Sequence, residues 1–147
     1  MKKITIIIPC FNEVNTIGQI IEQIMQLHNF EKKIIVVDDN SSDGSKKIIK
    51  EYESKKKIEA IFHEFNQGKG ACIISAQKFI EGDIVIIQDA DLEYDPKDIP
   101  KLVMPIVNGE YLVVYGSRIL GKNYFENIEN FSHWIRIVGN LILTKIS

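Results

Sequence analysis

The sequence predicts an α/β fold with a mostly parallel sheet and helices on both faces. Short runs of four or five apolar, largely β-branched residues recur along the chain, as in strands that are buried on both faces. Between these runs lie segments whose apolar residues recur at helical spacing, and strands that alternate with helices form a layered parallel sheet. The 147 residues, 45% of them hydrophobic, are enough for one domain with its own core.

Five strands are expected, each rich in isoleucine or valine. They cover residues 4–8, 34–37, 58–63, 84–87 and 112–115. The run at 58–63 is the weakest of the five, and the others are apolar throughout. A continuous apolar run predicts a strand with helices packed on both of its faces.

Two helices are expected in the first half of the chain. The first follows a cap at Asn15 or Thr16. Its apolar residues recur at helical spacing, at Ile17, Ile20, Ile21 and Ile24. The second helix is short and follows the polar segment 38–44, with apolar positions at Ile48, Ile49 and Tyr52.

Two more helices are expected in the second half. One opens at residues 68–70, with apolar positions at Ile73, Ile74 and Phe79. The other begins at Asp95-Pro96, because proline suits the first helical turn. Its apolar face comprises Ile99, Leu102, Val103 and Ile106. Pro100 and Pro105 leave the limits of this helix open.

Polar side chains gather where the expected strands end. They are Asn12, Glu13, Asp38, Asp39, Asp89, Asp91 and Arg118. Ligands of parallel α/β sheets bind beyond the carboxyl ends of the strands, so these residues mark the expected site.

Asp89-Ala90-Asp91 directly follows an apolar strand, and its two carboxylates are expected to face the same crevice. Unpaired burial of both would be unfavourable, and a divalent cation removes that penalty. Hard carboxylate oxygens suit Mg²⁺ or Mn²⁺, and Glu93 could add a third ligand. The alternative is a turn or helix cap. The position after a buried strand favours the metal.

The other strand ends suit a nucleotide. Asp39 could accept hydrogen bonds from a base or a ribose, or cap the following helix. Phe11 offers a flat face for a base, or packs in the core. Glu13 could bind the base or cap the next helix. Lys69 at a helix start and Arg118 after the last strand could contact phosphates, although Arg118 could equally be a surface residue.

Several classes of function are disfavoured. A net charge of −2 gives no basis for nucleic-acid binding. The chain has neither a Walker loop nor a GxSxG elbow, and its histidines lack metal-ligand spacing. Cys10 and Cys72, without CxxC spacing or a secretory signal, are expected to be free thiols in a reducing compartment.

Five ordered segments together resemble the family 2 glycosyltransferases of GT-A fold, a Rossmann-like architecture. The similarity is greatest to the dolichol-phosphate mannose synthase-like branch and its bacterial polyprenyl-phosphate relatives. The matching segments are residues 7–13, 36–44, 66–70, 88–93 and 115–118.

The resemblance implies a role for each matching position. Pro9, Phe11, Glu13 and Asp39 would form the nucleoside pocket. Asp89, Ala90 and Asp91 would contact the sugar-linked diphosphate. Asp89, Asp91 and Glu93 would hold Mg²⁺ or Mn²⁺. Asp91 and Arg118 would be catalytic, with Arg118 on a phosphate. Phe11 departs from the family, in which this aromatic residue is often tyrosine.

The resemblance also implies the partners. They are a UDP- or GDP-hexose, a polyprenyl phosphate and the cytoplasmic face of a membrane, with a possible homo-oligomer and no nucleic acid. Two parts are expected, a nucleotide-sugar-binding domain at 1–125 and an incomplete apolar helical segment at 126–147. That segment would lie in a membrane interface or pack on protein beyond the chain's end.

The expected reaction is transfer of the hexose with inversion. The alternatives are a sugar-to-sugar transferase and an inactive nucleotide-sugar-binding fragment. A signalling receiver domain is disfavoured, because its acidic pair would follow the first strand, which here ends in Pro9-Cys10-Phe11.

Overall fold

The computed structural model describes residues 3–28 and 30–116, and the fold given below is that of the unit Met1–Val114. Its strands are β1 (Lys3–Cys10), β2 (Glu31–Asp38), β3 (Glu59–Phe62) and β4 (Ile84–Ile87). Its α-helices are α1 (Ile17–Met25), α2 (Ser45–Ser54), α3 (Lys69–Ala76) and α4 (Ile99–Val107). Two short 3₁₀ turns, η1 (Gln77–Phe79) and η2 (Pro96–Asp98), complete the described elements.

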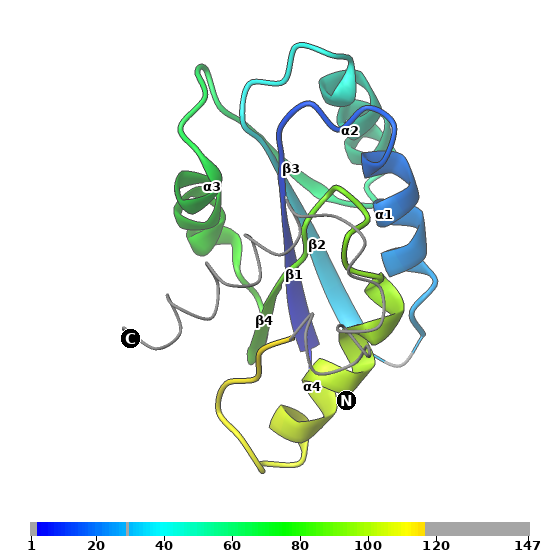
Figure 1. Ribbon diagram of the computed structural model, residues 1–147, viewed down its shortest axis with the longest axis vertical. Coiled ribbons are helices and arrows are strands. Elements are labelled where there is room, and N and C mark those ends of the chain that lie inside the picture. The colour runs from blue at the N-terminus through cyan, green and yellow to red at the C-terminus, as the bar shows by residue number, and fades with distance from the viewer. Residues whose placement is uncertain (1–2, 29, 117–147) are drawn as a thin grey trace, which may run out of the picture. The chain divides into compact units, whose positions relative to one another are not determined.

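The described sheet has four strands, all parallel, in the order β3-β2-β1-β4 (Figure 1). In its register Cys10 pairs with Asp38, and Asp38 pairs with Phe62. The carboxyl ends of β1, β2 and β3 therefore lie next to one another. The predicted α/β class and the first four predicted strands are confirmed.

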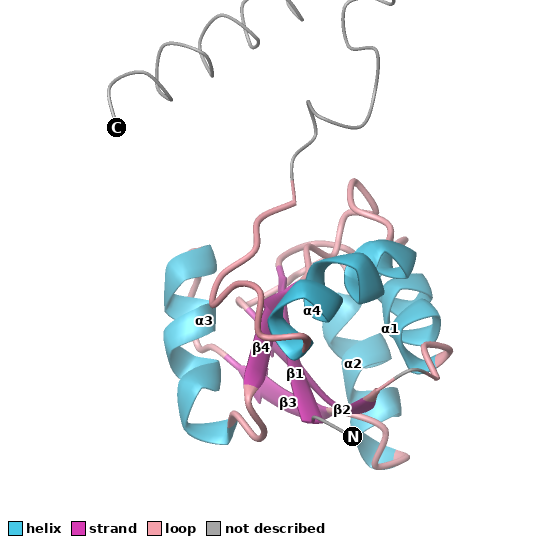
Figure 2. Ribbon diagram, turned by 90° about the horizontal axis from the view of Figure 1, so that it is seen from below, coloured by secondary structure: helices cyan, strands magenta, loops and turns pink. Residues whose placement is uncertain are grey.

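Helices cover both faces of the sheet, as predicted. Figure 2 shows α3 on one face and α1, α2 and α4 on the other. Alternate residues of β1 enter the two cores: Ile4, Ile6 and Ile8 face the larger core, and Ile7 packs with Cys72 and Ala76 of α3. The helical spacing of isoleucines in α1 is confirmed, since all four are buried.

The predicted fifth strand is wrong within the described residues. Residues 112–116 form no strand, and the side chains of Leu112, Val113 and Tyr115 are 94%, 62% and 87% exposed. A strand exists only where its backbone pairs with a neighbour, and segment 112–115 pairs with none in the described part of the chain. Apolar β-branched composition alone could not supply that partner.

The predicted apolar face of α3 is also wrong. Cys72 and Ala76 face the sheet, whereas Ile74 is 72% exposed and Ile73 is only partly buried. Small residues at the contact let the helix pack closely on Ile7, Ile35 and Val37. Phe79 lies in the 3₁₀ turn η1 and packs at the margin of this core.

Strand β4 departs from the expectation that every strand is buried on both faces. Val85 and Ile87 are 43% and 48% exposed, whereas Ile84 and Ile86 pack in the larger core. The small core under α3 contains residues of β1 and β2 but none of β4, which leaves one side of β4 uncovered by the described residues.

Two expectations concern residues outside the described ranges. Arg118 and the apolar segment 126–147 both lie there, so the domain boundary at residue 125 stays a prediction. Among the described helices, none has the length and apolar character needed to span a bilayer.

Candidate functional site

A pocket of about 240 Å³ opens at the carboxyl edge of the sheet. Residues from the ends of β1, β2 and β4 and from the start of α3 form its wall. They are Pro9, Cys10, Phe11, Glu13, Asp39, Lys69, Cys72, Asp89, Ala90 and Asp91. The structure thus brings together the residues predicted to bind the nucleotide sugar and the metal, except Glu93, which does not line the pocket, and Arg118, which lies outside the described ranges. Asn12 and Asp38, at the same strand ends, do not line it either.

Two loops form one rim of the pocket, and hydrogen bonds join them. The Asn12 N–H donates to Ser41 Oγ at 2.9 Å, and Asn12 Oδ1 accepts the Ser42 N–H at 2.9 Å. The Glu13 N–H donates to Ser45 Oγ at 2.8 Å. Asn12 has a positive φ of 57°, which asparagine tolerates better than most residues. These bonds fix the backbone between Phe11, which is 48% exposed, and Glu13.

The Glu13 carboxylate does not cap α1, because no backbone N–H of that helix donates to it. It accepts the Thr16 hydroxyl at 2.6 Å, immediately before α1, while the residue also lines the pocket. Asp38 is fully buried; its Oδ2 accepts the Ser41 N–H at 3.2 Å, and its Oδ1 has no hydrogen-bond partner among the described residues.

Asp39 is the best-partnered carboxylate of the pocket. It accepts the Gln67 N–H at 2.9 and 3.1 Å, the Gly68 N–H at 2.7 Å and a hydrogen bond with His63 Nδ1 at 2.7 Å. His63 Nε2 lies 2.9 Å from Ser75 Oγ. Burial acts to raise the pKa of Asp39, but these hydrogen bonds outweigh it and hold the pKa below its usual value. Asp39 therefore fixes the loop before α3.

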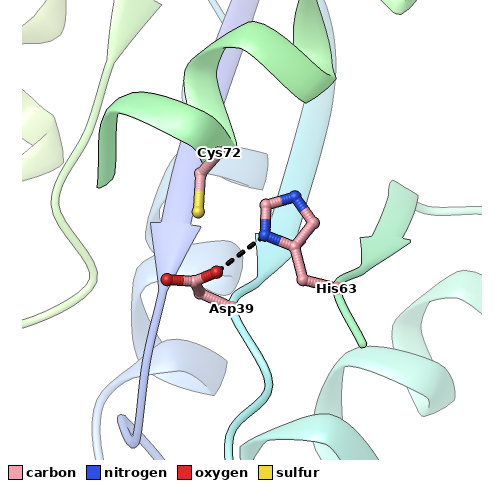
Figure 3. Close-up of side chains that lie close together, drawn as sticks. All are labelled: Asp39, His63 and Cys72. Carbon is pink, nitrogen blue, oxygen red and sulfur yellow. Dashed lines mark hydrogen bonds and ion pairs between the residues drawn. The ribbon is translucent and has the colours of Figure 1, made fainter. Parts of the chain in front are cut away.

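Asp39 and His63 are joined by a hydrogen bond, with Cys72 beside them, rather than arranged as a cage for a metal ion (Figure 3). Two ligands of a tetrahedral zinc ion lie about 3.4 Å apart, because each is about 2.1 Å from the metal at about 109°. His63 Nδ1 and Asp39 Oδ1 are only 2.7 Å apart. Burial, with repulsion from Asp39, raises the pKa of the Cys72 thiol to about 11. The short separation between Asp39 and His63 disfavours zinc here.

The acidic turn after β4 is held by a buried amide. Gln88 is 4% exposed, and its Nε2 donates to the carbonyl oxygens of Asp89 at 3.1 Å and Tyr94 at 2.9 Å. Asp91 Oδ1 accepts the Glu93 N–H at 3.0 Å across a turn in which Leu92 has a positive φ of 63°. Gln88 thereby fixes the backbone that presents Asp89 and Asp91 to the pocket.

The donor set fits Mg²⁺ or Mn²⁺. Asp89 and Asp91 line one pocket and supply hard carboxylate oxygens, and ions of this kind complete their shells with water and phosphate oxygens. The side chain of Asp89 is 24% exposed, so it is accessible from the pocket. Its Oδ1 forms an ion pair with Lys69 Nζ at the start of α3.

Sequence reasoning missed three residues of this region: His63, Ser75 and Gln88. His63 directly follows β3, at the same sheet edge as Asp39, and that position was the available signal. Gln88 had a similar signal, being the first polar residue after β4. Nothing in the sequence marks Ser75, which reaches His63 only because α3 packs over the sheet.

The buried thiols are poor nucleophiles. Burial, with repulsion from Asp38, raises the pKa of Cys10 to about 12, and that of Cys72 is about 11. Both are therefore protonated near neutral pH, and the thiolate is the nucleophilic form. This agrees with the low weight given to thiol chemistry from the sequence.

Residues 5–144 match the family model of "Glycosyl transferase family 2". Two curated relatives are archaeal. The chain is 36% identical to a UDP-N-acetylglucosamine–dolichyl-phosphate N-acetylglucosaminyltransferase of Methanococcus voltae, over 99% of this chain and 62% of the relative. It is 32% identical to a dolichol-phosphate mannosyltransferase of Pyrococcus furiosus, over 98% and 42%. The chain thus spans less than two thirds of these relatives.

Two solved structures share the fold. One is glucosyl-3-phosphoglycerate synthase of Mycobacterium tuberculosis with Mn²⁺, UDP and glucosyl-3-phosphoglycerate, with a TM-score of 0.61 and 25% identity over 74% of this chain and 41% of that one. The other is a mannosyltransferase of Pyrobaculum calidifontis with GDP-Man and Mn²⁺, with a TM-score of 0.56 and 25% identity over 61% and 28%.

Proposed function

The chain belongs to glycosyl transferase family 2, and on that premise we propose that it is the donor-binding part of a polyprenyl-phosphate hexosyltransferase. The donor would be a UDP- or GDP-hexose, and the acceptor a dolichyl or undecaprenyl phosphate. The single observation that supports this most is the pocket, in which an exposed aromatic ring, a carboxylate pair and a lysine at a helix start lie together.

Each part of the pocket suits one part of the donor. The exposed ring of Phe11 offers a stacking surface for the base, and Pro9 and Glu13 lie beside it. The start of α3, with Lys69, suits the diphosphate, because helix N-termini and ammonium groups both attract phosphate. Asp89 and Asp91 would hold Mg²⁺ or Mn²⁺, with Glu93 nearby. When bound, that ion would neutralise the departing nucleoside diphosphate.

The two relatives bear names that include a dolichyl or dolichol phosphate, which supports a lipid phosphate as acceptor. A phosphate monoester has a second pKa of about 6 and is already charged near neutral pH, so the transfer with inversion needs no strong protein base. A sugar hydroxyl acceptor would need one. Of the four pocket carboxylates, Asp39 is occupied by hydrogen bonds, Glu13 accepts the Thr16 hydroxyl and is assigned to the base, and Asp89 and Asp91 are assigned to the metal.

The same assignment implies where the protein works. A lipid-linked acceptor places it peripherally at a membrane surface, on the cytoplasmic side where nucleotide sugars are found, and Arg118 would contact a phosphate there. Self-association through the apolar segment 126–147 is a further part of this proposal, and nucleic acid has no place in it.

Calorimetry of UDP and GDP binding, with Mn²⁺ and with a chelator, tests the donor site on this chain. We expect one nucleotide to bind in the presence of Mn²⁺ and at least tenfold more weakly with the chelator, a loss of about 1.4 kcal/mol or more. Equal affinity in both conditions contradicts the metal role.

Transfer of labelled sugar from a donor panel tests the acceptor. We expect transfer onto a short-chain polyprenyl phosphate and none onto free sugars. The reverse result would favour the sugar-to-sugar alternative. Donor binding without transfer to either acceptor would favour the inactive nucleotide-sugar-binding fragment.

A further inference from the structure

Lys69 contacts one of the two carboxylates assigned to the metal. Its ammonium forms an ion pair with Asp89 Oδ1, and both residues line the pocket. Among the described residues, Lys69 is the only lysine that pairs with a carboxylate of this pocket. The other lysine ion pairs join Lys3, Lys33 and Lys101 to carboxylates elsewhere.

The two partners differ in how firmly they are held. The Gly68 N–H donates to Asp39 Oδ2 at 2.7 Å, so the backbone immediately before Lys69 is fixed. Gln88 fixes the backbone of Asp89. The Lys69 side chain, by contrast, is 55% exposed and has four rotatable methylenes. Its ammonium can therefore move without moving either loop.

A divalent cation on Asp89 Oδ1 would take the position that the Lys69 ammonium now occupies, and the two positive charges repel each other at such short range. Coordination through this oxygen therefore requires the Lys69 ammonium to leave it. Once displaced, the ammonium remains within reach of the pocket, where the nearest new anion would be the diphosphate held by the same cation. The lysine would exchange a carboxylate for a phosphate.

We infer that Lys69 is a resident counter-ion of Asp89, which a divalent cation must displace and which then contacts the donor's diphosphate. The cation and the nucleotide consequently bind cooperatively, and the cation alone binds weakly. The first half of this inference rests on the ion pair and on the metal proposed at Asp89, and the second half rests also on the proposed donor.

The first test titrates Mn²⁺ alone into the wild-type chain and into Lys69→Met, with free Mn²⁺ followed by electron paramagnetic resonance. We expect Lys69→Met to bind Mn²⁺ about three- to tenfold more tightly, since an exposed ion pair of this kind corresponds to a factor of up to about five and the repulsion is also removed.

Lys101→Met is the matched control. Lys101 pairs with Asp98 at 2.6 Å on the surface, away from the pocket, and its replacement changes the net charge equally. We expect Mn²⁺ affinity of this variant to equal that of the wild type. If Lys69→Met and Lys101→Met bind Mn²⁺ equally well, the counter-ion role is wrong.

The second test repeats the titrations with UDP or GDP present. In the wild type we expect the nucleotide to tighten Mn²⁺ binding at least tenfold. This coupling should fall severalfold in Lys69→Met and be retained in Lys69→Arg, which keeps the charge. Unchanged coupling in Lys69→Met overturns the movement to the diphosphate.

The two proposals fail in distinguishable ways. If neither nucleotide binds the wild-type chain with Mn²⁺, the proposed donor is wrong, and the Mn²⁺-only comparison still decides the counter-ion role. Circular dichroism of each variant establishes that a changed affinity does not reflect unfolding.

Discussion

The two edges of the sheet carry ionisable groups in contrasting arrangements. At the amino edge, Lys3 and Lys33 pair with Glu81 at 2.6 and 2.7 Å and with Glu31 and Glu59 at 3.6 and 3.5 Å. Each charge there has a partner within the cluster.

At the carboxyl edge, four carboxylates line one pocket with a single lysine. They are Glu13, Asp39, Asp89 and Asp91, with Lys69 as the cation. Of these four, only Asp39 accepts hydrogen bonds from the chain itself at both carboxylate oxygens. The difference teaches how to separate structural from functional charges: a cluster in which every charge has a partner stabilises the fold, and an excess of one sign around a pocket indicates a ligand of the other sign.

The largest expected effect is a loss of stability caused by a substitution at the amino edge. Gly82 has a φ of +91°, and a Cβ there would lie 2.3 Å from the Lys3 carbonyl oxygen. We expect Gly82→Ala to lower the free energy of unfolding by more than about 3 kcal/mol, because backbone strain and a backbone clash add. Urea denaturation measures it.

Gly109→Ala is the control for Gly82→Ala. Gly109 also has a positive φ, +76°, but nothing lies within 4 Å of its added Cβ. Its loss should be about 1 kcal/mol, the strain alone. Equal losses in the two variants would show that the close approach to Lys3 does not constrain the amino edge.

The next largest effect concerns the carboxyl edge. We expect Asp91→Asn to weaken Mn²⁺-dependent nucleotide binding about 100-fold, equivalent to about 2.7 kcal/mol, while stability stays the same or rises slightly. The asparagine Oδ1 can still accept the Glu93 N–H, so the turn should persist. Calorimetry and thermal denaturation measure the two quantities.

Glu81→Gln makes the equivalent change at the opposite edge and should leave nucleotide binding unaltered. Asp91→Asn should therefore weaken nucleotide binding without lowering stability, whereas Glu81→Gln should change stability alone. If Asp91→Asn unfolds the protein, its carboxylate is structural, and the contrast between the two edges disappears.

The sequence was sufficient for the features that depend on local pattern. The apolar runs of β1, β2 and β4 predicted these strands, and the spacing in α1 predicted its buried face, because each signal lies within a few consecutive residues. The positions of Asp39, Asp89 and Lys69 around one pocket followed from a general rule about carboxyl ends of parallel strands.

The missed features depend on contacts between distant segments. Segment 112–115 has strand composition but no described partner, and α3 packs through Cys72 and Ala76 because small residues fit the sheet closely. The bonds of His63 reach Asp39, which is 24 residues away in the sequence, and Ser75, which is 12 residues away. No local pattern specifies such a network.

A smaller loss of stability is expected when the hydrogen bonds around Asp39 are removed. His63→Phe removes a buried hydrogen bond to Asp39 and one to Ser75, and we expect a loss of about 2 kcal/mol in the free energy of unfolding. Nucleotide affinity should fall only severalfold, since the Gln67 and Gly68 N–H groups still hold Asp39.

Ser75→Ala separates the two bonds of His63. It removes only the contact with Nε2, so the loss should be about 1 kcal/mol, and nucleotide affinity should be unchanged. If Ser75→Ala is as damaging as His63→Phe, the bond to Asp39 contributes nothing measurable. Urea denaturation and calorimetry of both variants provide the comparison.

The smallest effect is a pH dependence at the amino edge. Hydrogen bonds and charges of Lys3 and Lys33 lower the pKa of Glu81 from 4.5 to about 2. A carboxyl group whose pKa is lower in the folded state stabilises the fold above its unfolded pKa. This contribution should be complete above about pH 4.5 and be lost as the pH falls toward 2.

The difference in melting temperature between the wild type and Glu81→Gln isolates that contribution, because other carboxyl groups titrate in both proteins. We expect a small difference near neutral pH that shrinks between about pH 4.5 and 2. Glu81 is half-exposed, so about 1 M salt, with a screening length of about 3 Å, should also reduce the difference. A difference that stays constant across this pH range would mean that Glu81 acts through packing or neutral hydrogen bonding, and that the amino edge is not stabilised by the neutralisation of its charges.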